Sequence, residues 1–215
     1  GLTSGNYEIT FVDGSLDITQ KALTITADDK TKEYDGTVYS PFTVSYSGFI
    51  TGEDETGLGG TLSFSGSAAT AANAGTYAIT PGGLTSGNYE ITFVDGSLDI
   101  TQKALTITAD NKTKEYDGTV YSPFTVSYSG FITGEDETNL SGTLSFVGTA
   151  ATATNVGTDY VITPGGLTSG NYDITFVDGG LDITQKALTV TAEDKIKEYD
   201  GTVYSPFTVS YSGFV

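Results

Sequence analysis

The sequence predicts an all-β protein made of tandem small β-sandwich repeats of immunoglobulin-like type, arranged as an elongated rod. Three observations support this prediction. A block of 82 or 83 residues recurs almost unchanged along the 215-residue chain, which is typical of a repeat architecture. Apolar residues within each block recur at every second position, as they do in half-buried strands. Turn residues separate these runs at short intervals, which is the spacing expected of a small sandwich.

The repeat boundaries divide the chain into four pieces. Residues 1–20 match the C-terminal part of a preceding repeat, residues 21–102 and 103–185 are complete repeats, and residues 186–215 match the N-terminal part of a following repeat. The two complete repeats differ by ten substitutions and one inserted residue, Asp159. Because the end pieces are partial, we expect open strand edges there, through which the chain could pair with itself.

About six or seven short strands are expected in each repeat. In the first run Leu23, Ile25 and Ala27 alternate with threonines, which predicts a strand with one buried face. The later alternating runs of the first complete repeat contain Phe42, Val44 and Tyr46; Leu62 and Phe64; Tyr77 and Ile79; Tyr89, Ile91 and Phe93; and Leu98 and Ile100.

Two kinds of turn are expected between the strands. Asp95-Gly96, which returns as Asp178-Gly179, predicts a tight hairpin between strands at residues 89–93 and 98–101, since Asp-Gly readily adopts positive φ angles. The sequence Tyr-Asp-Gly-Thr at residues 34–37 predicts a second turn. Residues 52–56 could form one turn of helix or a polar loop, and residues 68–74 are flanked by glycine and threonine. Both segments are interpreted mainly as loops.

The connection between repeats contains no flexible linker. The predicted strand at residues 98–101 passes through only Gln102 and Lys103 into the predicted strand at residues 104–107. We therefore expect neighbouring repeats of the same chain to contact one another in a nearly fixed orientation.

Composition excludes several classes of function. Nine lysines and no arginine oppose 27 acidic residues, so that the net charge is −18, and we expect neither nucleic-acid binding nor direct membrane insertion. Histidine and cysteine are absent, which removes the Ser-His-Asp and Cys-His arrangements of nucleophilic catalysis. The sequence predicts a protein that is not an enzyme and that requires no cofactor.

Calcium is the one metal that the residues favour, since hard cations take six to eight oxygen ligands. The candidate ligands are Asp28, Asp29, Asp35, Glu53, Asp54 and Asp99, which could converge near a junction between repeats. The alternative is that these acids are solvated loop residues that keep the chain soluble.

The tyrosines of the Tyr-Asp-Gly turns also have two interpretations. Tyr34, Tyr116 and Tyr199 could present their rings to a sugar. An aromatic residue before such a turn more often packs over the edge of the fold with its hydroxyl group bonded locally, and packing is the interpretation that we favour.

Four motifs in a fixed order carry a resemblance to a known family. They are KALTITAD, KEYDGT, SGFITGED and AGTYAITPGGLTSGNYEITFVDGSLDIT, which begin at Lys21, Lys32, Ser47 and Ala74. In this order they resemble the MBG and YDG type repeats of large bacterial surface proteins, including adhesins and filamentous-haemagglutinin-like exoproteins.

The resemblance implies a β-rich structural stalk or fibre repeat at the bacterial cell surface or outside the cell, which holds a distal functional domain away from the cell. Two alternatives stay open. The chain could be a subunit of a self-assembling extracellular filament, or the repeats themselves could bind a glycan or a host surface protein, with avidity that rises with copy number.

Overall fold

The computed structural model describes residues 1–215, which contain sixteen strands and four short 3₁₀ turns. The all-β prediction is confirmed. The chain divides into two compact units, one of residues Gly1–Lys32 and Thr37–Ile100, the other of residues Glu33–Gly36 and Thr101–Val215. No helix has the length and hydropathy of a membrane span.

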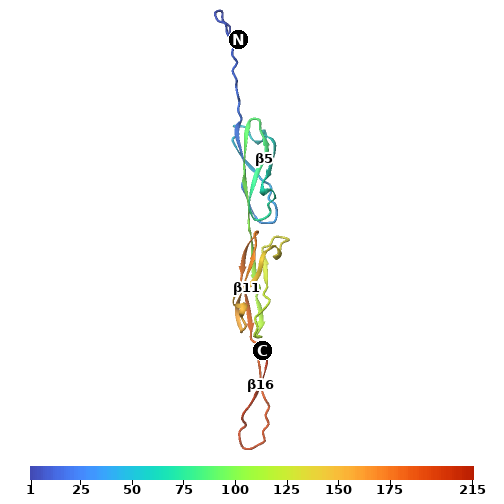
Figure 1. The fold of residues 1–215 in the computed structure, drawn as a ribbon. Coiled ribbons are helices and arrows are strands. Elements are labelled where there is room, and N and C mark those ends of the chain that lie inside the picture. Colours follow the sequence, from blue (N-terminus) through green and yellow to red (C-terminus); the bar gives the residue numbers. More distant parts are fainter. The chain divides into compact units, whose positions relative to one another are not determined.

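The first complete repeat forms two sheets (Figure 1). Its strands are β1 (Lys21–Ala27), β2 (Lys30–Glu33), β3 (Val44–Ser47), β4 (Gly59–Ser65), β5 (Gly75–Thr85), β6 (Tyr89–Val94) and β7 (Gly96–Thr101). One sheet has the order β3-β1-β6, and the other has the order β2-β7-β5-β4. Strand β1 pairs antiparallel with β3 and parallel with β6.

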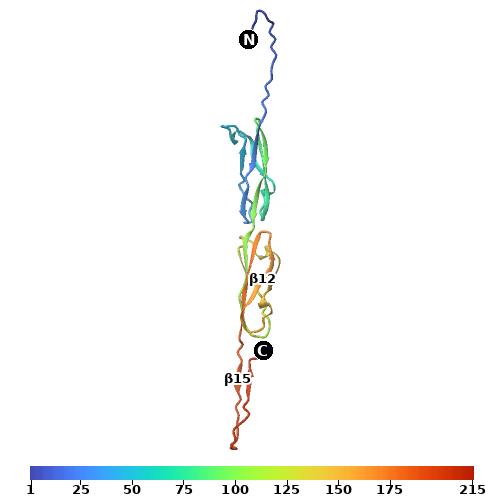
Figure 2. The ribbon, with the colours of Figure 1, turned by 90° about the vertical axis from the view of Figure 1, so that its left-hand side faces the viewer.

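The second complete repeat has the same topology (Figure 2). Its strands are β8 (Lys103–Ala109), β9 (Lys112–Glu115), β10 (Val126–Ser129), β11 (Ser141–Val147), β12 (Gly157–Thr168), β13 (Tyr172–Val177) and β14 (Gly179–Thr184). Strand β8 pairs parallel with β13, and β14 pairs parallel with β9. Each sheet therefore combines antiparallel and parallel strand pairs.

The two end pieces contain less regular structure. Residues 1–20 form no strand. In the third copy, β15 (Thr189–Ala192) pairs antiparallel with β16 (Val209–Ser212).

The alternating pattern places one face of each principal strand in the core. Leu23 and Ile25 of β1 are fully buried, as are Ile79 of β5 and Leu98 of β7. The second unit buries the equivalent positions Leu105, Ile107, Ile162 and Leu181. Burial of one such side chain stabilises the fold by about 1.5–3 kcal/mol.

The predicted hairpin at Asp95-Gly96 is wrong. Strands β6 and β7 belong to different sheets, and the chain crosses from one sheet to the other at Asp95. Gly96 has no positive φ angle. Glycine is needed at this position because the backbone of Gly96 lies close to that of Ala27. A Cβ atom on residue 96 would lie 2.4 Å from the carbonyl oxygen of Ala27.

Three short elements differ from the favoured interpretation of the sequence, although one turn of helix was the alternative for residues 52–56. Residues Glu55–Gly57 and Ser67–Thr70 form 3₁₀ turns rather than plain loops, and the first is capped by the side chain of Asp54. The polar strand β2, with sequence KTKE, lies at the edge of its sheet. It has no alternation of apolar and polar residues from which a strand could be predicted.

Candidate functional site

One polar cluster of the second unit contains Tyr34, Glu135 and Tyr172. The Tyr34 hydroxyl donates to Oε1 of Glu135 at 2.6 Å, and the Tyr172 hydroxyl donates to Oε2 of the same carboxylate at 2.5 Å. The two rings meet edge to face, with centroids 5.5 Å apart. Tyr34 and Tyr172 are only 3% and 2% exposed. We call these three residues the tyrosine–carboxylate cluster.

The backbone around Tyr34 fixes the position of its ring. The Tyr34 N–H donates to the carbonyl oxygen of Thr101 at 2.9 Å. Gly36 has a φ of +74°, an angle that glycine adopts without steric cost. A Cβ atom at Gly36 would lie 2.8 Å from Cδ1 of Ile132, so the turn packs directly on that side chain.

An ion pair involves Glu33, the residue before Tyr34. Lys103 donates to Oε1 of Glu33 at 2.6 Å. Both residues are partly exposed, and such pairs contribute about 0–1 kcal/mol. The burial of Tyr34 and its hydrogen bond to a charged group therefore carry most of the stabilisation.

Both tyrosines of the cluster are held in the protonated state. Burial, followed by the hydrogen bond to Glu135, raises the pKa of Tyr34 to about 12. The same two causes raise the pKa of Tyr172. A phenol in this state donates a hydrogen bond and is a poor base or nucleophile, so the arrangement is suited to binding rather than to proton transfer.

In the first unit, Glu53 and Tyr89 are the residues equivalent to Glu135 and Tyr172 of this cluster. The Tyr89 hydroxyl donates to Oε2 of Glu53 at 2.5 Å and accepts from the Ile50 N–H at 3.1 Å. In the second unit the Tyr172 hydroxyl makes the same two bonds, to Glu135 and from the Ile132 N–H, at 2.5 and 3.1 Å. Beside Tyr89 lies a cavity of about 330 Å³.

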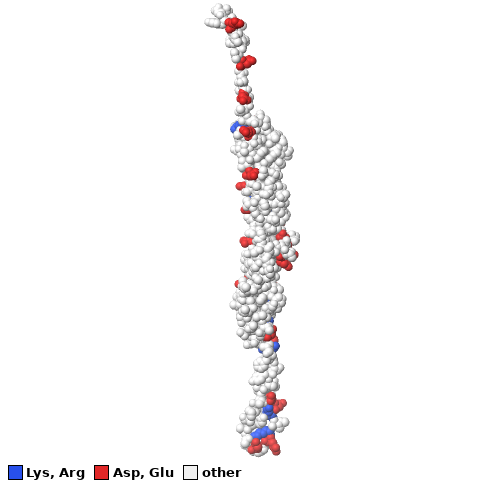
Figure 3. All heavy atoms as spheres, in the orientation of Figure 1, with Lys and Arg blue, Asp and Glu red and all other residues white.

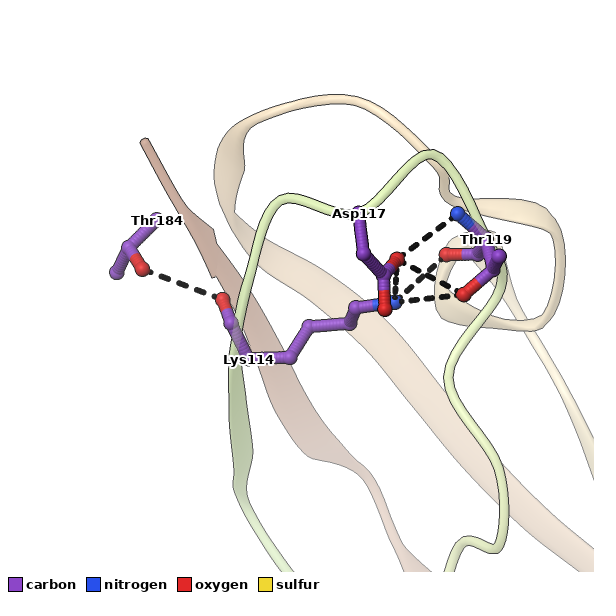
Figure 4. A network of polar contacts seen from close by, with 4 residues as sticks. All are labelled: Lys114, Asp117, Thr119 and Thr184. Carbon is purple, nitrogen blue, oxygen red and sulfur yellow. Dashed lines mark hydrogen bonds and ion pairs between the residues drawn. The ribbon is translucent and has the colours of Figure 1, made fainter. Parts of the chain in front are cut away.

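The Tyr-Asp-Gly turn predicted from the sequence is confirmed. In the second repeat, Lys114 Nζ lies 2.5 Å from Oδ1 of Asp117 and donates to the Thr119 carbonyl oxygen at 2.8 Å (Figure 4). The same carboxylate oxygen accepts from the N–H and hydroxyl of Thr119. These contacts hold the pKa of Asp117 well below its ordinary value, and the hydrogen bond from Lys114 is the largest cause.

The acids proposed as calcium ligands are engaged in contacts of the fold. Asp28 accepts from the Thr43 hydroxyl at 2.5 Å. Asp29 accepts from the N–H and hydroxyl of Ser97 at 2.7 and 2.9 Å, and these bonds lower its pKa. Asp28 and Asp29 therefore tie their loop to the neighbouring segments.

The other candidates are dispersed in the same way. Asp54 caps the turn that follows it, and the Thr76 hydroxyl lies 3.4 Å from Oδ1 of Asp99. Glu53 accepts from Tyr89, and Asp35 occupies the position in its turn that Asp117 occupies in the next repeat.

The expected convergence of these acids is not found, because no three acidic side chains form a group that could hold a metal ion. Figure 3 shows Asp and Glu as separate spots on the visible face rather than as one acidic surface. Calcium binding stays a prediction without a geometric site.

The structure corrects one expectation about Tyr34. Its ring packs, as favoured, but its hydroxyl group bonds to a carboxylate 101 residues away rather than locally. Sequence reasoning did not find this contact. The one sequence signal for such a contact was that the segments around Tyr34, Glu53 and Tyr89 all recur in the second repeat.

Comparison with known families now identifies the repeat. A family model described as MBG domain (YGX type) matches residues 23–99 and 105–182. The chain belongs to the MBG domain family. The resemblance seen in the sequence is therefore confirmed, and MBG repeats are typical of surface proteins. A search of curated proteins finds no match to the chain.

Proposed function

We propose that this MBG chain is a structural stalk segment of a large bacterial surface or secreted adhesin, which holds a distal functional domain away from the cell and catalyses no reaction. The observation that carries the proposal is that the distinctive side chains serve the fold. Tyr34 and Tyr172 are buried against Glu135, Asp29 ties its loop to strand β7, and Asp117 bonds within its turn.

The connection between strands also favours a structural role. Only Gln102 separates β7 from β8. The segment Glu33–Gly36, which begins at the last residue of β2, is part of the second unit. A stalk needs short connections of this kind, because flexible linkers would let its repeats collapse on one another.

Membership of the MBG family supports placement at the surface, since its repeats are typical of surface proteins. The net charge of −18 fits a chain that must stay dissolved at high local density. The glycan-binding alternative needs exposed aromatic rings. Tyr34 is only 3% exposed, so this alternative would rest on the third tyrosine of the motif, Tyr199, which is 95% exposed.

The test is to measure length against copy number. Chains of two, four and six complete repeats are compared by small-angle X-ray scattering. The eleven residues of β5, at about 3.3 Å each, correspond to about 36 Å, and we expect the maximum dimension to grow by a constant increment of at least this size per repeat. A dimension that levels off between four and six repeats would show that the array folds back, and the stalk proposal would fail.

Location needs a separate measurement. An antibody raised against the two-repeat chain is applied to intact and to lysed cells of the source organism. We expect equal labelling of both. Labelling that appears only after lysis would contradict the proposed surface role.

A further inference from the structure

Strand β6 and its equivalent β13 each lie at an edge of their sheet. In the sheet β3-β1-β6 the strand β6 pairs only with β1, and in the sheet β10-β8-β13 the strand β13 pairs only with β8. Both strands lie inside complete repeats, so this open edge is a property of the repeat itself. An edge strand presents unpaired N–H and C=O groups to which another strand can bind.

The other edge strands of the repeat carry features that hinder such pairing. Strand β2 has four residues, and its sequence KTKE contains three charged side chains. Strand β3 also has only four residues. Strand β4 contains a bulge between Gly60 and Ser63, and Gly60 has a φ of +81°. Charged residues, short length and bulges are the features by which proteins keep sheet edges from pairing.

Strand β6 has none of these features. Its six residues, YEITFV, include no proline, glycine or lysine. Its register with β1 continues without a bulge from Lys21–Tyr89 to Thr26–Val94. Strand β13, with the sequence YDITFV, pairs with β8 in the same unbroken way. Short segments rich in aromatic and β-branched residues, with few charges, are typical of strands that pair readily.

The direction of the backbone groups shows which of them are free. The first residue of β1 donates its N–H to the carbonyl oxygen of Asn88 at 3.0 Å, so the groups of Asn88 face β1. Successive residues of a strand direct their N–H and C=O groups to opposite sides. The groups of Ile91 and Phe93 therefore face the open edge. The Tyr89 N–H has the same direction, and it donates to Oγ of Ser86 at 3.1 Å rather than to β1.

We propose that this edge strand, β6 or β13, binds the same edge of a second copy of this chain as an antiparallel pair. When Thr92 lies opposite the equivalent threonine of the second copy, Ile91 lies opposite Phe93. These two residues then exchange backbone hydrogen bonds through the groups that face the edge. The inference goes beyond the stalk role and does not depend on it.

The sequence of the strand is complementary to itself in this register. Ile91 and Phe93 are partly buried at the margin of the core, and pairing would cover them further. Glu90 lies opposite Val94 of the second copy rather than opposite another carboxylate, so like charges do not meet directly. Strand β13 has the equivalent residues in the same order. Each chain therefore has two such edges, and two contacts made together strengthen binding.

One strand of six residues buries little area, so we expect weak association, with a Kd in the micromolar to millimolar range. The test is sedimentation equilibrium of the full 215-residue chain up to about 1 mM. One variant combines Thr92→Lys with Thr175→Lys, and a second combines Thr92→Glu with Thr175→Glu. Both threonines are exposed. In the proposed register each introduced charge meets the same charge of the second copy, which opposes pairing.

Each charged variant alone is expected to stay monomeric, whereas an equimolar mixture of the two should associate at least as strongly as the parent chain. The matched control combines Ser45→Lys with Ser127→Lys, at exposed positions of the edge strands β3 and β10. It should associate as the parent does. Both lysine variants make the net charge less negative, so general repulsion would not explain a loss of association in the first alone.

Hydrogen exchange of the parent chain gives a second readout that needs no substitution. The amides of Ile91 and Phe93 should exchange rapidly in dilute solution and more slowly as the concentration rises. The amide of Thr92, which faces β1, should be protected at every concentration.

Four outcomes would overturn the proposal. They are a parent chain that stays monomeric up to about 1 mM, association that persists in both charged variants, a mixture that does not associate, and exchange at Ile91 and Phe93 that does not change with concentration. Persistence in both variants would point to pairing through the end pieces at residues 1–20 and 186–215 instead.

Discussion

Replacing Tyr34 by phenylalanine isolates the hydrogen bond that the tyrosine–carboxylate cluster adds to the second unit. The ring, which is 3% exposed, stays in place, and Oε1 of Glu135 loses its donor at 2.6 Å. Hydrogen bonds to charged groups contribute about 1.5–3 kcal/mol. Glu135 keeps its bond from Tyr172, so we expect the lower part of this range, about 1.5 kcal/mol.

The assay is urea unfolding followed by the NMR signals of buried side chains in each unit. For a unit of this size the denaturant slope is about 1–1.5 kcal/mol per molar urea, so the midpoint for Ile107 and Ile162 in the second unit should fall by about 1 M. Signals of Ile79 in the first unit should keep their midpoint.

The dependence on pH provides a second signature of the same bond. The pKa of Tyr34 is raised from 10 to about 12 in the folded chain. Between these values the unfolded state loses this proton and the folded state keeps it. The stabilisation is therefore complete below pH 10 and is lost as the pH rises through 12. Tyr34→Phe should reduce the decline in stability of the second unit over this interval.

The matched control is Tyr199→Phe, which removes the same atom from a residue that is 95% exposed. This variant should leave both midpoints unchanged. Equal midpoint shifts for Tyr34→Phe and Tyr199→Phe would refute the assignment of a stabilising role to the buried bond.

Three further outcomes are expected. Gly96→Ala should lower the free energy of unfolding by about 1–3 kcal/mol, because its Cβ atom would lie 2.4 Å from the Ala27 oxygen, whereas Gly82→Ala, with no atom within 4 Å, should be tolerated; equal melting temperatures would contradict this. Lys114→Ala should raise the pKa of Asp117 toward its ordinary 3.8, measured by carbon NMR titration, since the hydrogen bond from Lys114 is the first cause of its depression; an unmoved pKa would show that the lysine is not responsible. Millimolar calcium should leave the melting temperature unchanged, because no three acids form a metal-holding group; a clear rise would establish a site that the geometry does not show.

Local periodicity accounts for the parts of the fold that could be predicted. Alternation in a strand places every second side chain on the same face. The pattern of Leu23, Ile25 and Ala27 therefore identified both the strand β1 and its buried residues. The repetition and the family motifs are equally properties of the linear sequence, and the family match confirms two tandem MBG repeats.

Pairing between distant segments could not be read from the same pattern. Strand β1 pairs parallel with β6, so that Ile25 lies opposite Phe93, and no local signal specifies such a partner. Asp95-Gly96 was interpreted as a hairpin because Asp-Gly turns are common between antiparallel strands. Its glycine instead permits a close approach to Ala27, which depends on how the two sheets meet.

The candidate site also combines features that local sequence predicts with contacts that it does not predict. The sequence by itself determined the repeated strands, the Tyr-Asp-Gly turn and the absence of histidine and cysteine, because these depend on residue type and local spacing. Only the tertiary structure decided that Tyr34 bonds to Glu135, and that the calcium candidates do not converge. The physical reason is that hydrogen bonds and ion coordination require atoms within about 3 Å, and residues far apart in a chain reach that distance only when the sheets have packed.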